Sequence, residues 1–202
     1  SGAGVVFQLI RALEISQWDG IHEDIVFATL GTVADLVELR GDNRMLVSMG
    51  LRALNSIEQG PIAELLQEAN LKPGSVTSTD IAFRLAPRIN AAGRMADPTI
   101  ALEALLRGGQ QLKELSSLNA QRQSDTEVFT NQTLEELGLD ADSRTDIPVL
   151  MSSKHGDYPH GIIGLIAGRL TEQFGRPSMI AVIDGDLCTA SLRSPKCYNI
   201  TE

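Results

Sequence analysis

The chain has 202 residues, of which 43% are hydrophobic and 21% are charged. This composition suits a globular protein with a substantial core, and it excludes wholesale disorder, a collagen-like repeat and a disulfide-stapled miniprotein. The formal net charge of −9 disfavours attraction to nucleic acid over the whole surface, so any nucleic-acid site must be a local cluster of Arg and Lys.

The sequence has no apolar run of the roughly 18–20 residues that a membrane helix needs, so we expect no membrane association. Its two cysteines, Cys188 and Cys197, lack the spacing of a zinc ribbon or a redox Cys-x-x-Cys motif. Free cysteines without a secretion signal favour the reducing cytoplasm, which is the location that we expect.

The first third of the chain predicts helices around one buried strand. Residues 4–14, 43–54 and 61–69 carry apolar side chains at helical spacing. Residues 25–30 form a nearly unbroken apolar run, which is typical of a strand that is buried on both faces of an α/β sheet.

The middle of the chain predicts a helical region. Ser78, Thr79 and Asp80 are suited to cap a helix that starts near Ile81, and Gly93 is expected to break it. Residues 99–137 predict a long helical stretch that Gly108 and Gly109 interrupt. The acidic polar loop 138–146 is the best candidate for a domain boundary.

The last quarter predicts strands at 147–151, 177–183 and 187–192, with an amphipathic helix at 161–174. Asp184, Gly185 and Asp186 predict a hairpin turn between the last two strands. The fold class that follows is α/β.

Asp35 is the candidate metal ligand and catalytic residue. It follows the expected strand 25–30, and ligand sites in open α/β sheets lie at the carboxyl ends of strands. A carboxylate at that position suits a divalent cation. The alternative is that Asp35 only caps a helix or a turn.

A local positive island lies between Asp80 and Asp97, where Arg84, Arg88 and Arg94 occur without an acidic residue. Asn90 and the small residues beside it would let a phosphate approach closely, and Arg presents a planar fork to phosphate oxygens. The alternative is a solvated helix face with ordinary ion pairs.

Two further segments suit an anion. Ser191, Arg193 and Ser194, followed by Lys196 and Tyr198, are typical of a groove that tracks a single strand, although an exposed turn would look the same. The helix start at His160 and Gly161 offers the positive end of a helix dipole, although it could equally be a packed helix with an exposed cap.

Four segments in this order resemble one family. LGTVADLVELRGDNRMLVSMGLRALN (30–55) resembles the fourth motif region of the DHH phosphoesterase superfamily, and more narrowly of RecJ-type single-strand-specific DNA exonucleases. FRLAPRINAAGRM (83–95) is similar to the RecJ stretch before the long helix that joins the two core domains. GIIGLIAGRLTEQFGRPSMIA (161–181) and ASLRS (190–194) resemble the start and the Gly-Ser-x-Arg-Ser motif of the DHHA1 domain.

The resemblance implies a function and roles for particular residues. Asp35 corresponds to a ligand of the family's catalytic pair of Mn²⁺ or Mg²⁺ ions. Asn90, Arg94 and the neighbouring Arg88 become candidate contacts to single-stranded DNA, as do the DHHA1 candidates His160, Gly161, Ser191, Arg193 and Ser194. The implied reaction is stepwise 5′→3′ hydrolysis of phosphodiester bonds in DNA repair and recombination, with two metal ions activating water.

The sequence departs from the family in ways that limit this expectation. The Asp-x-Asp-type segment and the Asp-His-His motif are absent, and the chain starts at Ser1 rather than Met, so we expect a fragment that is inactive as a nuclease by itself. Pro159 occupies the position where many relatives have His, which leaves the role of His160 open. After Ser194 the chain reads Pro-Lys-Cys-Tyr, where relatives usually have Ile-Pro-Gly-Phe.

The resemblance also implies an architecture. Residues 1–70 would be the C-terminal part of a parallel-sheet DHH domain, 71–144 a helical connector, and 145–202 part of a DHHA1 domain of mixed sheet and helices. Incomplete domains would expose apolar faces, so we expect self-association. Two alternative functions stay open: a DHH/DHHA1 phosphodiesterase for short oligoribonucleotides or cyclic dinucleotides, and a non-catalytic replication scaffold.

Overall fold

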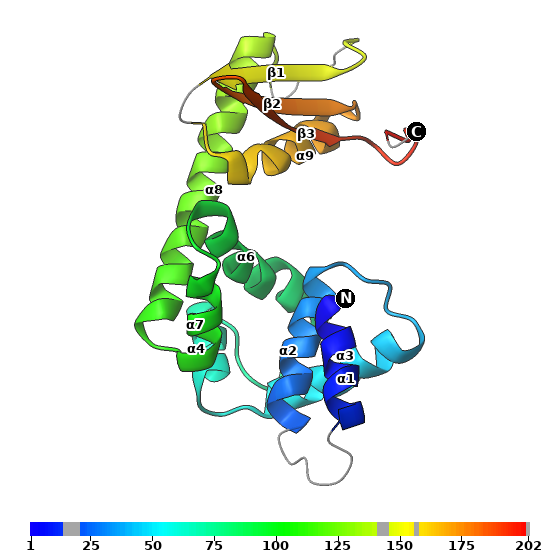
Figure 1. Cartoon of the computed structure of the whole chain (residues 1–202), viewed down its shortest axis with the longest axis vertical. Coiled ribbons are helices and arrows are strands. Elements are labelled where there is room, and N and C mark those ends of the chain that lie inside the picture. Colours follow the sequence, from blue (N-terminus) through cyan, green and yellow to red (C-terminus); the bar gives the residue numbers. More distant parts are fainter. Residues whose placement is uncertain (14–20, 141–145, 156–157, 201–202) are drawn as a thin grey trace. The chain divides into compact units, whose positions relative to one another are not determined.

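The computed structural model describes residues 1–13, 21–140, 146–155 and 158–200 (Figure 1). The chain divides into two compact units, Ser1–Asn119 (unit 1) and Ala120–Glu202 (unit 2), and the division falls within the long helix α8 (Gln110–Leu137). The expected domains 1–70, 71–144 and 145–202 follow family boundaries rather than compactness, and they remain a prediction.

Unit 1 is built from helices in the part of it that the structure describes. Its elements before α8 are α1 (Gly2–Leu13), α2 (Ile21–Ala34), α3 (Gly41–Ser56), α4 (Pro61–Glu68), α5 (Ser78–Asp80), the π-helical turn η1 (Ile81–Leu85), α6 (Ala86–Met95) and α7 (Thr99–Arg107).

The strand expected at residues 25–30 is wrong, because this segment lies in the middle of α2. The helix is enclosed on several sides. A Cβ on Gly31 would lie 2.6 Å from Ala3 of α1, and a Cβ on Gly50 of α3 would overlap the side chain of Thr29. A helix that is buried all round has an unbroken apolar sequence, which periodicity cannot distinguish from a buried strand.

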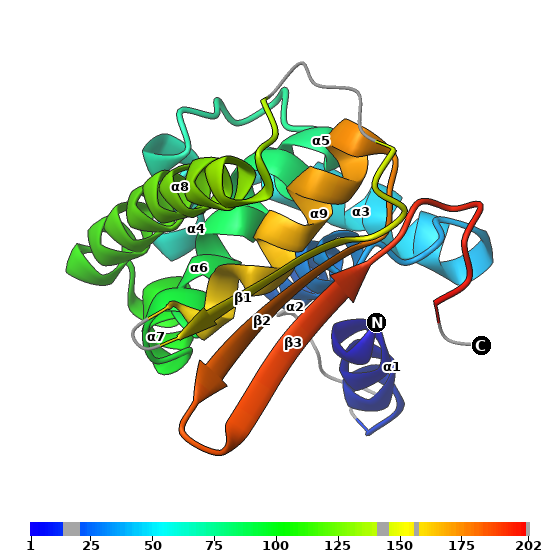
Figure 2. The same ribbon diagram turned by 90° about the horizontal axis from the view of Figure 1, so that it is seen from above.

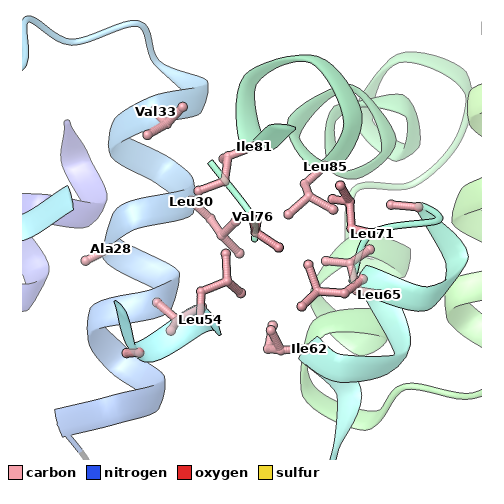
Figure 3. Close-up of a cluster of buried hydrophobic side chains, with 14 of the residues drawn as sticks. Ala28, Leu30, Val33, Leu54, Ile62, Leu65, Leu71, Val76, Ile81 and Leu85 are labelled. Carbon is pink, nitrogen blue, oxygen red and sulfur yellow. The ribbon is translucent and has the colours of Figure 1, made fainter. Parts of the chain in front are cut away.

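The core of unit 1 lies where α2 meets the turn η1 and the helix α4 (Figure 3). Leu30 of α2 and Ile81 of η1 point toward each other, and Leu85 and Leu65 close the other side of the cluster. Ile81 and Leu85 are fully buried. This packing places η1, and therefore the start of α6, beside the C-terminal half of α2.

The entry into α6 is more continuous than the sequence predicts. Thr77 is the N-cap residue, and it exchanges hydrogen bonds with Asp80 in a capping box. The chain then runs through α5 and η1 into α6 without leaving a helical conformation, and α6 continues through Gly93 to Met95. The break expected at Gly93 is therefore wrong.

The interruption expected at Gly108 and Gly109 is confirmed, since α7 ends at Arg107 and α8 begins at Gln110. Both glycines have positive φ, at 69° and 66°, which an L side chain rarely adopts. The backbone N–H of Gly109 donates to the Glu64 carboxylate at 2.6 Å, so an acidic side chain stabilises the N-terminal end of α8.

Unit 2 contains a three-stranded mixed sheet of β1 (Leu150–His155), β2 (Ser178–Asp184) and β3 (Leu187–Arg193), side by side in that order (Figure 2). β1 pairs with β2 in parallel, and the β2–β3 hairpin is antiparallel. The short turn η2 (His160–Ile162) leads into α9 (Ile163–Phe174), which packs on β2 and β3. These elements confirm the α/β class and the mixed sheet, although β1 starts three residues later than expected.

No helix among the described residues is long and apolar enough to cross a bilayer. Cys188 and Cys197 are both free thiols at exposed positions.

Candidate nucleic-acid interface

The end of β3 carries two of the candidate side chains on one face. Ser191 and Arg193 are two residues apart in an extended strand, so both project to the same side of the sheet. Arg193 donates from Nη1 to Ser191 Oγ at 3.1 Å and to the carbonyl of Leu192 at 2.7 Å. These bonds hold the guanidinium over the strand from which it comes.

The first turn of α9 lies directly against this pair. A Cβ on Gly164 would be 3.0 Å from both Arg193 Nη2 and Ser191 Oγ, so glycine lets these two groups lie close against the helix. We call the set Gly164, Ser191 and Arg193 the α9–β3 cradle. Thr171, two turns further along α9, donates from Oγ1 to the carbonyl of Arg193 at 3.3 Å and ties the strand end to the same helix.

The electrostatics of the cradle favour an anion. The N-terminal end of a helix carries a partial positive charge, and α9 has no acidic residue in its first turn. Within the part of the chain that the structure describes, Arg193 forms no ion pair with a carboxylate. A guanidinium, a hydroxyl and a helix N-terminus together are the groups that proteins use to hold a phosphate.

The remaining candidates of unit 2 occupy two different places. His160 and Gly161 form η2, immediately before α9, and His160 is exposed. Ser194 follows β3, but its hydroxyl donates to the carbonyl of Tyr198 at 2.8 Å, within a turn that the Tyr198 N–H to Pro195 carbonyl bond closes. The structure therefore gives Ser194 a turn-forming contact, and its role in binding remains a prediction.

Asp35 lies at the C-terminal end of α2 rather than after a strand. Its N–H donates to the Gly31 carbonyl at 3.0 Å, and Leu36, with φ at 54°, ends the helix in a left-handed conformation. The side chain is exposed. Because a helix C-terminus is partly negative, a carboxylate there adds to a field that attracts a cation.

The described residues do not form a metal site on their own. They contain no group of three or more His, Cys, Asp or Glu side chains that could hold a metal ion. A divalent cation such as Mg²⁺ or Mn²⁺ needs several oxygen ligands, so the Asp35 carboxylate can supply only one of them.

Asn90 and Arg94 project from the same side of α6. They are four residues apart, and both are exposed, whereas Ala91 and Ala92 are fully buried against unit 1. The helix therefore presents the amide and the guanidinium to solvent, which is the arrangement that a contact to a nucleic-acid backbone requires.

Arg84 and Arg88 have structural contacts that the sequence did not reveal. Arg84 donates from Nη2 to the carbonyls of Ala69 and Asn70, at 2.5 and 2.9 Å, and so satisfies the end of α4. Arg88 donates to the carbonyl of Arg84 at 2.5 Å. Burial lowers the pKa of the half-buried Arg88, Arg84 lowers it further, and the charge of Glu68 opposes both effects.

The polar side chains of residues 81–96 therefore fall into two groups. Arg84 and Arg88 donate hydrogen bonds to backbone carbonyl groups, while Asn90 and Arg94 are exposed. Sequence could not make this distinction, because the carbonyls of Ala69 and Asn70 that Arg84 contacts lie 15 and 14 residues earlier in the chain. Binding of nucleic acid by Arg88 remains a prediction.

The described residues thus form an α/β chain in which a guanidinium, a hydroxyl and a helix N-terminus lie together in the α9–β3 cradle, and in which the Asp35 carboxylate is exposed at a helix end. Comparison with curated proteins gives a consistent result. The chain is 32% identical to the single-stranded-DNA-specific exonuclease RecJ of Bacillus subtilis, over 100% of this chain and 26% of that protein. It is 35% identical to RecJ of Thermus thermophilus, over 88% of this chain and 26% of that protein.

Solved structures give the same relation. The crystal structure of Thermus thermophilus RecJ in complex with Mg²⁺ matches with a TM-score of 0.81 and 28% identity, over 100% of this chain and 31% of that chain. The same protein in complex with Mn²⁺ matches with a TM-score of 0.78 and 29% identity, over 96% of this chain and 29% of that chain. No protein-family model matches the chain.

These comparisons confirm the resemblance to RecJ exonucleases, and they confirm it across the full length of the chain. The chain spans only 26–35% of the curated relatives that it matches. For this chain, the activity of those whole proteins is therefore a proposal.

Proposed function

We propose that this chain is part of a metal-dependent, single-stranded-DNA-specific 5′→3′ exonuclease, and that its α9–β3 cradle holds a phosphate of the DNA strand. The observation that carries the proposal is the close approach of Arg193 and Ser191 to the first turn of α9 at Gly164, where a Cβ would lie only 3.0 Å from Arg193 Nη2 and from Ser191 Oγ. The similarity to RecJ proteins, whose name describes single-stranded DNA as the substrate, supports the same conclusion.

The other candidates extend this proposal along the strand. His160 and Gly161 would contact the nucleotide beside the cradle, because they directly precede α9. In unit 1, Asn90 and Arg94 would contact the DNA backbone, and Arg88 would support them from its half-buried position. Contacts of this kind to phosphate oxygens position a strand without reading its sequence.

Asp35 would contribute one carboxylate to a Mn²⁺ or Mg²⁺ site whose other ligands come from residues outside this sequence. The RecJ structures in complex with Mn²⁺ and Mg²⁺ support divalent-metal use by those relatives. Since the described residues provide no complete ligand set, we expect the chain alone to be inactive as a nuclease. A role in DNA repair and recombination and a cytoplasmic location are parts of the same proposal.

The three expected domains also belong to the proposal. Residues 1–70 would be the end of a DHH domain, 71–144 a connector, and 145–202 the start of a DHHA1 domain. Exposed apolar side chains on α1, namely Val5, Val6, Leu9 and Leu13, support the expected self-association of the chain. Light scattering at increasing protein concentration tests it, and a constant monomer mass would contradict it.

The decisive experiment is fluorescence anisotropy of a 5′-phosphorylated DNA oligonucleotide that is titrated with the chain at two salt concentrations. We expect salt-sensitive binding that Arg193→Ala weakens by roughly 10-fold, because a charge-assisted contact to phosphate is lost. Arg169→Ala is the matched control, since Arg169 is an exposed arginine of α9 outside the cradle. Equal binding by both variants and the unmodified chain would overturn the proposal.

A further inference from the structure

Two aromatic rings pack together beneath the start of α9. Tyr158 lies directly before Pro159 and η2, and its ring centroid is 4.4 Å from that of Phe129 on α8, with the planes inclined by 52°. Only 6% of Tyr158 is exposed. Tilted aromatic pairs at this distance add to the stabilisation from burial, so the ring is held firmly on α8.

The Tyr158 ring also contacts one member of a charged pair. The ammonium of Lys154 on β1 lies 5.8 Å from the ring centroid, within the range of a cation–π contact. The same ammonium pairs with Glu136 near the end of α8, and Glu136 also accepts a hydrogen bond from Ser152 Oγ at 3.1 Å. We call Phe129, Glu136, Lys154 and Tyr158 the aromatic socket.

The socket is connected to the cradle by a short, stiff segment. Pro159 has its φ restricted by its ring, and its carbonyl accepts the N–H of Ile162 at 3.2 Å, which forms the turn η2. Ile162 and Ile163 are buried and start α9. Any shift of Tyr158 is therefore transmitted over two residues to His160 and over six to Gly164.

We propose that Tyr158 is a positioning residue, whose ring, seated in the aromatic socket, fixes the N-terminal end of α9 against Ser191 and Arg193, so that the helix end and these two side chains present their donors to the same phosphate. This inference rests on the proposed function of the α9–β3 cradle. Unlike the cradle residues, Tyr158 would act without touching the nucleic acid. The socket draws its members from α8, β1 and the segment before η2, so it holds the helix end in register with the sheet.

The test uses the whole chain with Tyr158→Leu, which removes the ring, and Tyr158→Phe, which keeps it. Val182→Ala is the control for a general loss of stability, because Val182 is fully buried in β2 outside the socket. Phe129→Leu removes the other ring should Tyr158→Leu not fold. The readouts are the dissociation constant for the 5′-phosphorylated oligonucleotide and the amide NMR shifts of Gly161 and Gly164 without DNA.

We expect Tyr158→Leu to shift both glycine amides and to weaken binding about 10-fold, while Tyr158→Phe binds within about twofold of the unmodified chain. Val182→Ala should leave the glycine amides and the binding unchanged. Unshifted glycine amides in Tyr158→Leu would overturn the positioning role whatever the chain binds. If the unmodified chain binds the oligonucleotide no better than Arg193→Ala does, the proposed function is overturned instead. The glycine amide shifts would still decide whether Tyr158 positions the start of α9.

Discussion

Unit 2 brings its candidate binding groups together by local packing, whereas the candidate carboxylate of unit 1 belongs to no group of three or more metal-ligating side chains among the described residues. In unit 2 the contact between α9 and the end of β3 places Ser191 and Arg193 close to Gly164, where a Cβ would lie 3.0 Å from Ser191 Oγ and from Arg193 Nη2. In unit 1, Asp35 directly follows α2 and is exposed. The two units therefore differ in how many of the proposed binding groups lie together.

The difference has a physical cause. An anion site needs only a few donors and a helix end, and one helix packed on one strand provides them. A divalent cation needs several oxygen ligands in a closed shell, which requires carboxylates from several segments. This explains why the groups that suit an anion lie together within unit 2, while the Asp35 carboxylate of unit 1 supplies only one of the oxygen ligands that a divalent cation needs.

The largest effect is expected when the cradle itself is filled. Gly164→Leu places a side chain where a Cβ alone would already lie 3.0 Å from Arg193 Nη2 and Ser191 Oγ, so it should displace both groups from the helix end and weaken binding of the 5′-phosphorylated oligonucleotide by about 100-fold. The measurement is fluorescence anisotropy at low salt. Gly168→Leu on the same helix is the matched control, because a Cβ there meets nothing within 4 Å. Equal losses for both variants would show that the cradle is not the binding site.

A packing change in unit 1 should affect stability and leave the cradle intact. Gly50→Ala puts a Cβ onto Thr29 and within 2.9 Å of the Ile25 carbonyl, so the free energy of unfolding should fall by about 2 kcal/mol. Hydrogen exchange of the α2 and α3 amides measures this. Gly2→Ala, in open space, is the control. Weaker oligonucleotide binding by a folded Gly50→Ala would contradict the independence of the cradle.

The aromatic socket predicts a smaller, pH-dependent effect within unit 2. The hydrogen bond from Lys154 holds the pKa of Glu136 below its ordinary value of 4.5. A lowered pKa in the folded state stabilises the fold above pH 4.5, and this contribution is lost as pH falls through the folded value. Glu136→Gln should therefore destabilise unit 2 slightly at pH 7, by less than about 1 kcal/mol because half of the Glu136 side chain is exposed.

Hydrogen exchange of the β1 amides, at pH 7 and at pH 3 to 4, measures how much less stable unit 2 is in Glu136→Gln than in the unmodified chain. The difference in stability between the unmodified chain and Glu136→Gln should narrow as pH falls through the folded-state pKa of Glu136, because protonation then removes the charge that the Gln variant also lacks. An equal difference in stability at both pH values would show that the carboxylate charge does not stabilise the aromatic socket.

The smallest effect is expected at Asp35. Asp35→Asn removes one exposed charge but no side-chain hydrogen bond or ion pair within the described residues, so both thermal stability and oligonucleotide binding by this chain should change little, with binding within about twofold. The measurement is the same anisotropy titration, beside a thermal melt. A large change in either quantity would mean that Asp35 already acts within unit 1 without further ligands, which would remove the contrast between the two units.

Sequence predicted the elements of unit 2 better than those of unit 1. The hairpin around Gly185 and the helix after Gly161 are confirmed, because an Asp-Gly-Asp turn separates β2 from β3 and the apolar residues of α9 recur at helical spacing. The segment 25–30 was mistaken for a strand, because α2 is enclosed by its neighbours and its sequence loses the helical period.

The sequence by itself determined which residues carry charge, which segments form the hairpin and the connector helices, and which residue types suit a phosphate. Only the tertiary structure decided that Gly164 lies against Ser191 and Arg193. It also decided that Arg84 and Arg88 donate hydrogen bonds to backbone carbonyl groups, while Asn90 and Arg94 are exposed. The reason is that the contacts of Gly164 and of Arg84 join residues 14 to 29 positions apart, and contacts at such separations depend on packing rather than on local propensity.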